Sequence, residues 1–149
     1  MPKIDLTLEQ CEQVLESQEL GYLSMSRDGE PYCLPFNFAY YQGCIYIHTG
    51  RKGLKWDFLK ENSRVCFAVA ASVQKKSGLS PCQYTYEFES VVLFGTASIV
   101  DSLEERNKSM SCIIDKYKTA PVTPVPEDKL EKVMILKIEI DKLSGRKNS

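Results

Sequence analysis

A basic turn between an alternating segment and a helical one carries the side chains with the clearest chemistry in this chain. Residues 45–49 alternate in a strand-like pattern, and helical spacing begins after Gly53. Gly50, Arg51 and Lys52 lie between these two segments. The free backbone N–H groups of a first helical turn attract an anion, and nearby basic side chains add full positive charges. The pattern predicts a phosphate site, with a solvated basic turn as the alternative.

The spacing within this turn favours a small phosphate ligand. The chain has neither the G-x-x-x-x-G-K-[ST] loop of nucleoside triphosphate sites nor the G-x-G-x-x-G of dinucleotide sites, so a mononucleotide or another monophosphate fits better. His48, next to Thr49, can donate to a phosphate oxygen, and a dianion would favour its protonated form. The alternative for His48 is a hydrogen-bonded residue at a strand end.

Composition restricts the classes of function. The 149 residues carry a net charge of −1, which predicts one domain over residues 1–149 and gives no overall field that would attract nucleic acid. No segment approaches the roughly 20 apolar residues that span a bilayer, so no membrane association is expected. Six cysteines without a C-x-x-C pair, and a single histidine, predict no metal site. A Met1 start without an apolar leader predicts reduced thiols in a cytoplasmic protein.

Turn signals and hydrophobic periodicity predict mainly β structure with peripheral helices. The expected strands lie near residues 20–26, 31–41, 44–49, 65–71, 83–100 and 133–140, and the helices after Thr7, Gly53 and Asp101. The strand over 83–100 is long enough to need a bulge near Glu89 or Gly95. We expect a loop over 74–81, a stiff crossover over 119–126 and a frayed tail over about 144–149. The order of hairpins favours a small closed barrel.

Four sequence blocks lie in order along the chain: Gly21–Met25, Pro35–Phe38, Ile45–Lys52 and Ser90–Ala97. Together they resemble the nitroimidazole-resistance branch of the pyridoxamine 5′-phosphate oxidase-like flavoproteins. The resemblance covers about residues 5–141. It implies a six-stranded antiparallel split β-barrel that forms a homodimer and binds FMN in two clefts at the subunit interface.

The same resemblance implies cofactor-binding residues in three places. The phosphate and ribityl chain would be held by His48, Thr49, Arg51 and Lys52. The isoalloxazine ring would meet backbone groups of Pro35, Phe36, Asn37 and Phe38. The far wall of the cleft would come from the second subunit, with Tyr86 and Ser90 as candidates. Trp56 would either stack on the cofactor or pack its helix onto the barrel.

The implied activity is redox chemistry, in which the flavin passes electrons from NAD(P)H to a small acceptor such as a nitroaromatic or a quinone. No catalytic side chain is assigned. A non-catalytic flavin or haem carrier or sensor is the alternative, and FAD or a deazaflavin could replace FMN. Pyridoxamine phosphate oxidation is disfavoured, because residues 137–149 lack the Arg-rich segment typical of those oxidases. A cofactor-free barrel that contacts a partner protein or nucleic acid is a third possibility.

Overall fold

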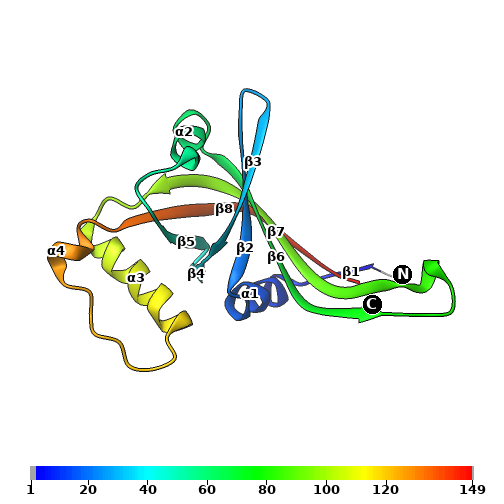
Figure 1. The fold of residues 1–149 in the computed structure, drawn as a ribbon. Coiled ribbons are helices and arrows are strands. Elements are labelled where there is room, and N and C mark those ends of the chain that lie inside the picture. Colours follow the sequence, from blue (N-terminus) through cyan, green and yellow to red (C-terminus); the bar gives the residue numbers. More distant parts are fainter. Residues whose placement is uncertain (1–2, 149) are drawn as a thin grey trace.

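The computed structural model describes residues 3–148, and its main element is one curved eight-stranded antiparallel sheet (Figure 1). The strands are β1 (Lys3–Asp5), β2 (Leu20–Arg27), β3 (Glu30–Asn37), β4 (Ala39–Tyr41), β5 (Cys44–Thr49), β6 (Arg64–Lys76), β7 (Thr85–Ile99) and β8 (Met134–Asn148). The helices are α1 (Leu8–Ser17), α2 (Leu54–Glu61), α3 (Leu103–Tyr117) and α4 (Glu127–Leu130), with a 3-10 turn at Pro81–Gln83. The expected mainly β fold is confirmed, with eight strands in place of six.

The sheet order is β3-β2-β6-β7-β8-β5-β4, and β1 pairs with β8. β3 therefore lies at one edge and β4 at the other, although the two strands follow one another in sequence. The chain joins them through Phe38, which is fully buried. The sheet thus curls toward closure but keeps a split between β3 and β5, where β3 has a free edge.

Short-range sequence patterns explain the helix start, the hairpin turn and the strand alternation in the first part of the chain. The Thr7 hydroxyl accepts from the backbone N–H of Gln10, and the Thr7 backbone N–H donates to the side-chain oxygen of Gln10, which is the expected capping box. The β2–β3 hairpin turns at Asp28 and Gly29, with φ angles of 49° and 82°. The side chains of β2 alternate between the core and the outer face, as a strand covered on one side requires.

The barrel core is apolar and close-packed. The rings of Phe38 and Phe67 meet edge to face with centroids 5.0 Å apart, and both side chains are fully buried. A second cluster lies where α3 covers β4, β5 and the start of β8, and it contains Tyr46, Met110 and Ile135. The helix therefore covers the outer face of these strands, while the other outer face of the sheet remains open.

Four features differ from the expectations, and the first is that the strand expected over 31–41 is two strands, β3 and β4, which are separated at Phe38. The tail expected to fray is strand through Asn148, because residues 144–148 pair with β7 and residues 146–148 also pair with β1. The missing side chain of Gly145 lets α1 pack beside this part of β8, since a Cβ there would lie 2.7 Å from the sulfur of Cys11 on α1. The loop expected from residue 74 begins after Lys76, because β6 resumes beyond a bulge. α3 is capped by Ser102 and not by Asp101.

Long strands form an arm beside the barrel. β6, β7 and β8 run past the barrel and end, with β1, at the right of Figure 1. The register of β7 against β8 shifts between Phe94 and Gly95, which confirms the expected bulge at Gly95. A Cβ at Gly95 would lie 2.2 Å from the carbonyl oxygen of Glu139, so only glycine fits there.

The six cysteines all carry free thiols. Within residues 3–148, no three His, Cys, Asp or Glu side chains gather in a way that would hold a metal ion. None of the described helices has the length and apolar character needed to cross a bilayer.

Candidate functional site

The turn between β5 and α2 has two of its carbonyl groups held by side chains of α2. The indole N–H of Trp56 donates to the carbonyl of Gly50 at 2.8 Å, and the ammonium group of Lys55 donates to the carbonyl of Lys52 at 3.0 Å. In a trans peptide the C=O and the following N–H point in opposite directions. These two bonds therefore direct the N–H groups of Arg51 and Gly53 away from α2.

Several N–H groups at this turn have no acceptor within the described part of the chain. They belong to Arg51, Lys52, Gly53, Leu54 and Lys55. Gly53 is the N-cap residue of α2 with φ of 133°, and no side chain caps the helix. Most helices place Ser, Thr, Asp or Asn at this position to satisfy such donors. An uncapped N-terminus beside basic side chains is suited to bind an anion.

Three of the residues expected at the phosphate lie along one groove of about 400 Å³: His48, Thr49 and Arg51. Lys52 is exposed in the same turn but does not line this groove. The Arg51 guanidinium donates twice to the carbonyl of Lys132, at 3.1 and 2.8 Å. The turn is therefore fastened to the segment that precedes β8.

The groove also contains two basic residues that sequence reasoning missed, Lys129 and Lys132 of the α4 region. About 80 positions separate them from Arg51 in the chain, and no spacing rule connects residues over such a distance. The only available signal was a pair of lysines within a largely acidic segment after Pro126, a pattern typical of an ordinary solvated helix face.

A more apolar hollow of about 460 Å³ lies on the other side of the turn. Trp56 and Leu59 of α2 form one wall, and Ala97 and Leu136 form another. Arg51 borders both this hollow and the basic groove. Trp56 packs against the barrel core and also lines the hollow, so its indole holds α2 in place and is accessible to a ligand.

The free edge of β3 offers backbone groups close to this turn. Pro31 and Pro35 lack an N–H and lie four residues apart, so their nitrogens must face away from β2. Backbone direction alternates along a strand, and Cys33 and Asn37 therefore also direct their backbone groups to the free edge. β3 contacts β5, the strand that leads into the turn. A flat ligand lying in the split would find donors and acceptors here.

The structure does not bring Tyr86 and Ser90 to the turn of their own chain. Both lie on the part of β7 toward the arm, and Tyr86 is 52% exposed. Ala97, which lines the apolar hollow, is seven residues beyond Ser90, or roughly 23 Å along the strand. Their role at a cofactor therefore requires a second copy of the chain.

The sequence model of the pyridoxamine 5′-phosphate oxidase family matches residues 7–147. The chain belongs to this family. The match covers nearly the whole chain and confirms the resemblance found in the four sequence blocks.

Solved structures share the fold of this family member at low identity. A proposed 5-nitroimidazole antibiotic resistance protein from Bacteroides thetaiotaomicron has a TM-score of 0.82 and 21% identity, over 99% of this chain and 92% of that one. An FAD-binding protein from Mesorhizobium loti has a TM-score of 0.71 and 24% identity over all of both chains. An FAD- and haem-binding protein from Mycobacterium smegmatis has a TM-score of 0.85 and 19% identity, over 100% of this chain and 74% of that one.

In this family member Phe38 has no backbone group free for a ligand. Its N–H donates to the hydroxyl of Tyr117 at 2.8 Å, and that hydroxyl lies 2.6 Å from the carbonyls of both Phe38 and Glu19. Burial raises the pKa of Tyr117, which keeps the hydroxyl protonated as a donor. Phe36 packs its side chain against the core. Of residues 35–38, Pro35 and Asn37 are therefore the two whose backbone groups lie at the free edge of β3.

We expect Tyr117→Phe to lower the free energy of unfolding by about 1–3 kcal/mol, since it leaves buried groups of Phe38 without a partner. Urea denaturation would measure the loss. Tyr41→Phe is the matched control, because the hydroxyl of Tyr41 makes no hydrogen bond within the described residues. Equal effects of the two substitutions would show that the Tyr117 hydroxyl does not brace Phe38.

Lys116 also contacts Phe38, and its lowered pKa makes the stability of the protein depend on pH. Its ammonium group lies 3.8 Å from the Phe38 ring centroid and donates to the carbonyl of Leu15 at 3.0 Å. Burial lowers the pKa of Lys116 to about 8, although Glu19 and Glu16 raise it. In the unfolded chain a lysine has a pKa of about 10.4. Between pH 8 and that pKa, unfolded Lys116 holds a proton that folded Lys116 has lost, so the free energy of unfolding rises with pH.

Wild type should therefore gain stability relative to Lys116→Met as the pH rises from about 7 to about 10. Urea denaturation of both proteins at the two pH values measures the difference, and titration of the shared cysteines and tyrosines cancels. A difference that stays constant with pH would contradict this assignment.

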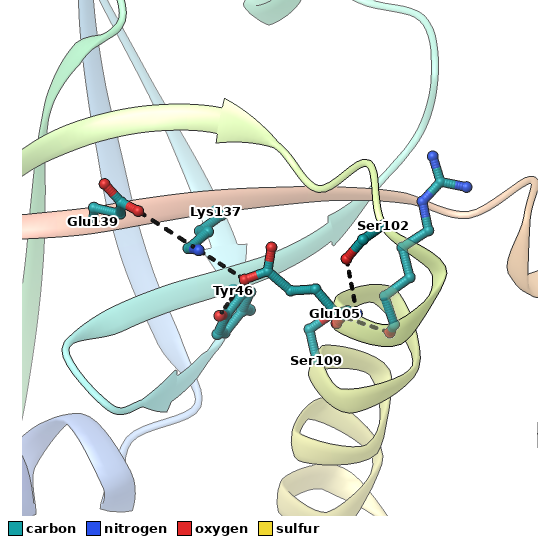
Figure 2. Close-up of polar contacts among 7 residues, drawn as sticks. Tyr46, Ser102, Glu105, Ser109, Lys137 and Glu139 are labelled. Carbon is teal, nitrogen blue, oxygen red and sulfur yellow. Dashed lines mark hydrogen bonds and ion pairs between the residues drawn. The ribbon is translucent and has the colours of Figure 1, made fainter.

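A polar network fixes α3 on the outer face of the barrel (Figure 2). The carboxylate of Glu105 accepts from Lys137 at 2.7 Å and from the hydroxyl of Tyr46 at 3.1 Å. The hydrogen bond from Lys137 lowers the pKa of Glu105, and the same bond raises the pKa of Lys137. Because these charges compensate one another, the network is structural, and it positions the helix that carries Tyr117.

Proposed function

We propose that the chain binds a flavin through its 5′-phosphate, and FMN is the smallest flavin that carries this group. The observation that supports this most strongly is the uncapped start of α2, where unpaired N–H groups lie beside Arg51. An anion there gains several charge-assisted hydrogen bonds at once. The phosphate lies on the turn, with Arg51, His48, Thr49 and Lys52 around it.

The free edge of β3 would orient the ring of the flavin. The Pro35 carbonyl is an acceptor, and the Asn37 N–H is a donor, for the polar edge of an isoalloxazine. The exposed side chain of Asn37 makes no hydrogen bond within the described residues and adds an amide to the same edge. The indole of Trp56 lines the neighbouring apolar hollow and shields that side from water.

A bound flavin would supply hydride and electron transfer, from a nicotinamide reductant to a small acceptor such as a nitroaromatic or a quinone. The residues of the chain bind and orient the ring and limit access to it. Solved neighbours bind FAD, or FAD and haem, and a carrier that needs no turnover is the alternative function. Reduction of the bound flavin by NADPH or NADH separates the two roles.

A homodimer would complete the cleft. The open outer face of β2, β6 and β7 carries cross-strand rows of apolar side chains, with Tyr22 50% and Phe94 44% exposed. Such a face is suited to a second copy, since apolar patches of this kind mark interfaces. The members of this face are Tyr22, Cys66, Ala68, Val92 and Phe94. Tyr86 and Ser90 of the second copy would then form the far wall.

Two measurements test this proposal. FMN at about 100 times its dissociation constant should stabilise the protein by roughly 2.7 kcal/mol, which a thermal unfolding assay detects readily, whereas inorganic phosphate alone should do less. Anaerobic NADPH or NADH should then bleach the bound flavin, and a nitroaromatic or quinone should restore its colour. A protein that FMN does not stabilise would overturn the flavin assignment, and bound flavin that neither nicotinamide reduces would favour the carrier role.

A further inference from the structure

The apolar hollow beside α2 lies at an end of the barrel that side chains do not fill. Ala97 and Ile99 of β7 pair in register with Ile138 and Leu136 of β8, so these four side chains share one face of the sheet. Ala97, Leu136 and Ile138 belong to the barrel core. Ile99 lies on the same inner face, yet it is 42% exposed. Because side chains normally fill the interior of a small barrel, an exposed inward residue indicates that this end is open.

A hollow of about 460 Å³ occupies this open end, which we call the barrel mouth, and its volume is typical of sites for small molecules. Its lining is mostly carbon, contributed by Trp56, Leu59, Ile99, Met134 and Leu136. An aromatic ring would bury this apolar surface, stack on the indole and contact the methionine sulfur. We therefore expect the body of a ligand here to be flat and apolar.

One guanidinium group gives the barrel mouth a preference for anions. Arg51 lies at its border, and Nε and Nη2 of the guanidinium donate to the carbonyl of Lys132 at 3.1 and 2.8 Å. These bonds fix the plane of the group and use one of its forked edges. Within residues 3–148, Nη1 makes no hydrogen bond and the guanidinium forms no ion pair. A second edge is therefore free to donate to both oxygens of a carboxylate.

The other charges near the mouth do not compete with this contact. The acidic residues of α2, Asp57 and Glu61, do not line the hollow, and Glu61 pairs with Arg27, with 3.7 Å between its carboxylate and Nε. Lys60 lines the mouth, but it is exposed, so water and salt screen its charge. Arg51 is thus the principal contact for an anionic group.

We propose that the barrel mouth binds a small aromatic carboxylate. The ring lies against Trp56 and Met134, and the carboxylate lies on the free edge of the Arg51 guanidinium. This inference goes beyond the proposed flavin site and does not rest on it, since the ligand lies at the inner face of the sheet and uses none of the unpaired N–H groups of the turn. A ligand bound here contacts the two side chains that fasten the turn, Trp56 and Arg51.

Naphthoate is the probe, used with the full chain as purified and in a buffer without phosphate. Titration calorimetry should show that it binds at least about tenfold more tightly than naphthalenemethanol, its neutral analogue, because only the anion gains the charge-assisted contact. Acetate, which has the charge without the ring, should not bind measurably. Trp56 is the only tryptophan of the chain, so its indole N–H gives one NMR signal, which naphthoate should shift.

Two substitutions at Ile99 test the location. Ile99→Glu places a negative charge in the mouth at a partly exposed position and should weaken naphthoate binding about tenfold or more. Ile99→Gln is the matched control, because it has nearly the same shape as the glutamate without the charge, and should weaken binding by less than about threefold. Melting curves would show that both variants are folded. Arg51→Gln is an independent variant, which should lower the affinity for naphthoate to that for naphthalenemethanol.

Equal affinity of wild type for naphthoate and naphthalenemethanol would overturn the assignment to an anion. Binding that leaves the indole signal unchanged, or that Ile99→Glu and Ile99→Gln weaken equally, would overturn the location. Riboflavin carries the flavin ring without a phosphate. If riboflavin displaced naphthoate competitively, the mouth would belong to the flavin ring and the inference would be overturned. If no flavin bound while naphthoate bound as expected, the proposed function would fail and this inference would stand.

Discussion

Replacing Arg51 with glutamine should weaken FMN binding about ten- to hundredfold while changing riboflavin affinity by less than about twofold, because a charge-assisted contact to the phosphate is lost. Riboflavin has the same ring and ribityl chain without the phosphate, so the ratio of the two affinities isolates the phosphate contact. Titration by flavin fluorescence measures both affinities.

The control for this experiment is Lys118→Gln, which removes one positive charge from the exposed end of α3 and should leave the ratio unchanged. Arg51 also fastens the turn to Lys132. If Arg51→Gln weakened FMN and riboflavin equally, the role of Arg51 would be to position the turn, and the phosphate would have to lie elsewhere.

The largest expected effect on stability is that of Phe38→Ala, which should lower the free energy of unfolding by about 3–5 kcal/mol. Phe38 is fully buried, meets Phe67 edge to face and lies under the ammonium group of Lys116. Its removal leaves a cavity where β3 passes into β4. For a chain of this size the melting temperature should fall by roughly 10 °C, as calorimetry would measure.

Phe38→Leu should cost less, since it keeps most of the buried volume. Val122→Ala, at a 53% exposed position, should change stability by less than about 0.5 kcal/mol. A loss under about 1 kcal/mol for Phe38→Ala would contradict the structure at the join between β3 and β4. Flavin affinity of the Phe38→Leu protein would show how far the free edge of β3 depends on this packing.

Sequence patterns predicted the parts of the fold that neighbouring residues determine. The capping box at Thr7, the turns at Asp28 and Gln42, and the bulge at Gly95 each depend on residues close in the chain. The basic turn followed by α2 was also predictable, because strand and helix periodicity meet there. Its phosphate-binding role stays a prediction.

Long-range contacts account for what the sequence did not show. Residues 144–148 are polar enough to be taken for a frayed tail, but β1 and β7 pair with them and Gly145 admits α1 beside them. Tyr117 reaches Phe38 across 79 positions, and Lys132 reaches Arg51 across 81. No local sequence pattern indicates such contacts. The hydrogen bonds of Tyr117 to Phe38, and the lysines that line the groove beside Arg51, could therefore be found only from the fold.

The most direct test of the account is the visible absorption spectrum of the purified protein, together with chromatography of whatever is released on denaturation. The purified protein should show flavin bands and release a flavin that carries a 5′-phosphate, as FMN or FAD. A Soret band without flavin would place the protein among haem binders. A colourless protein whose stability neither FMN nor FAD changes would contradict the flavin site and the redox function built on it.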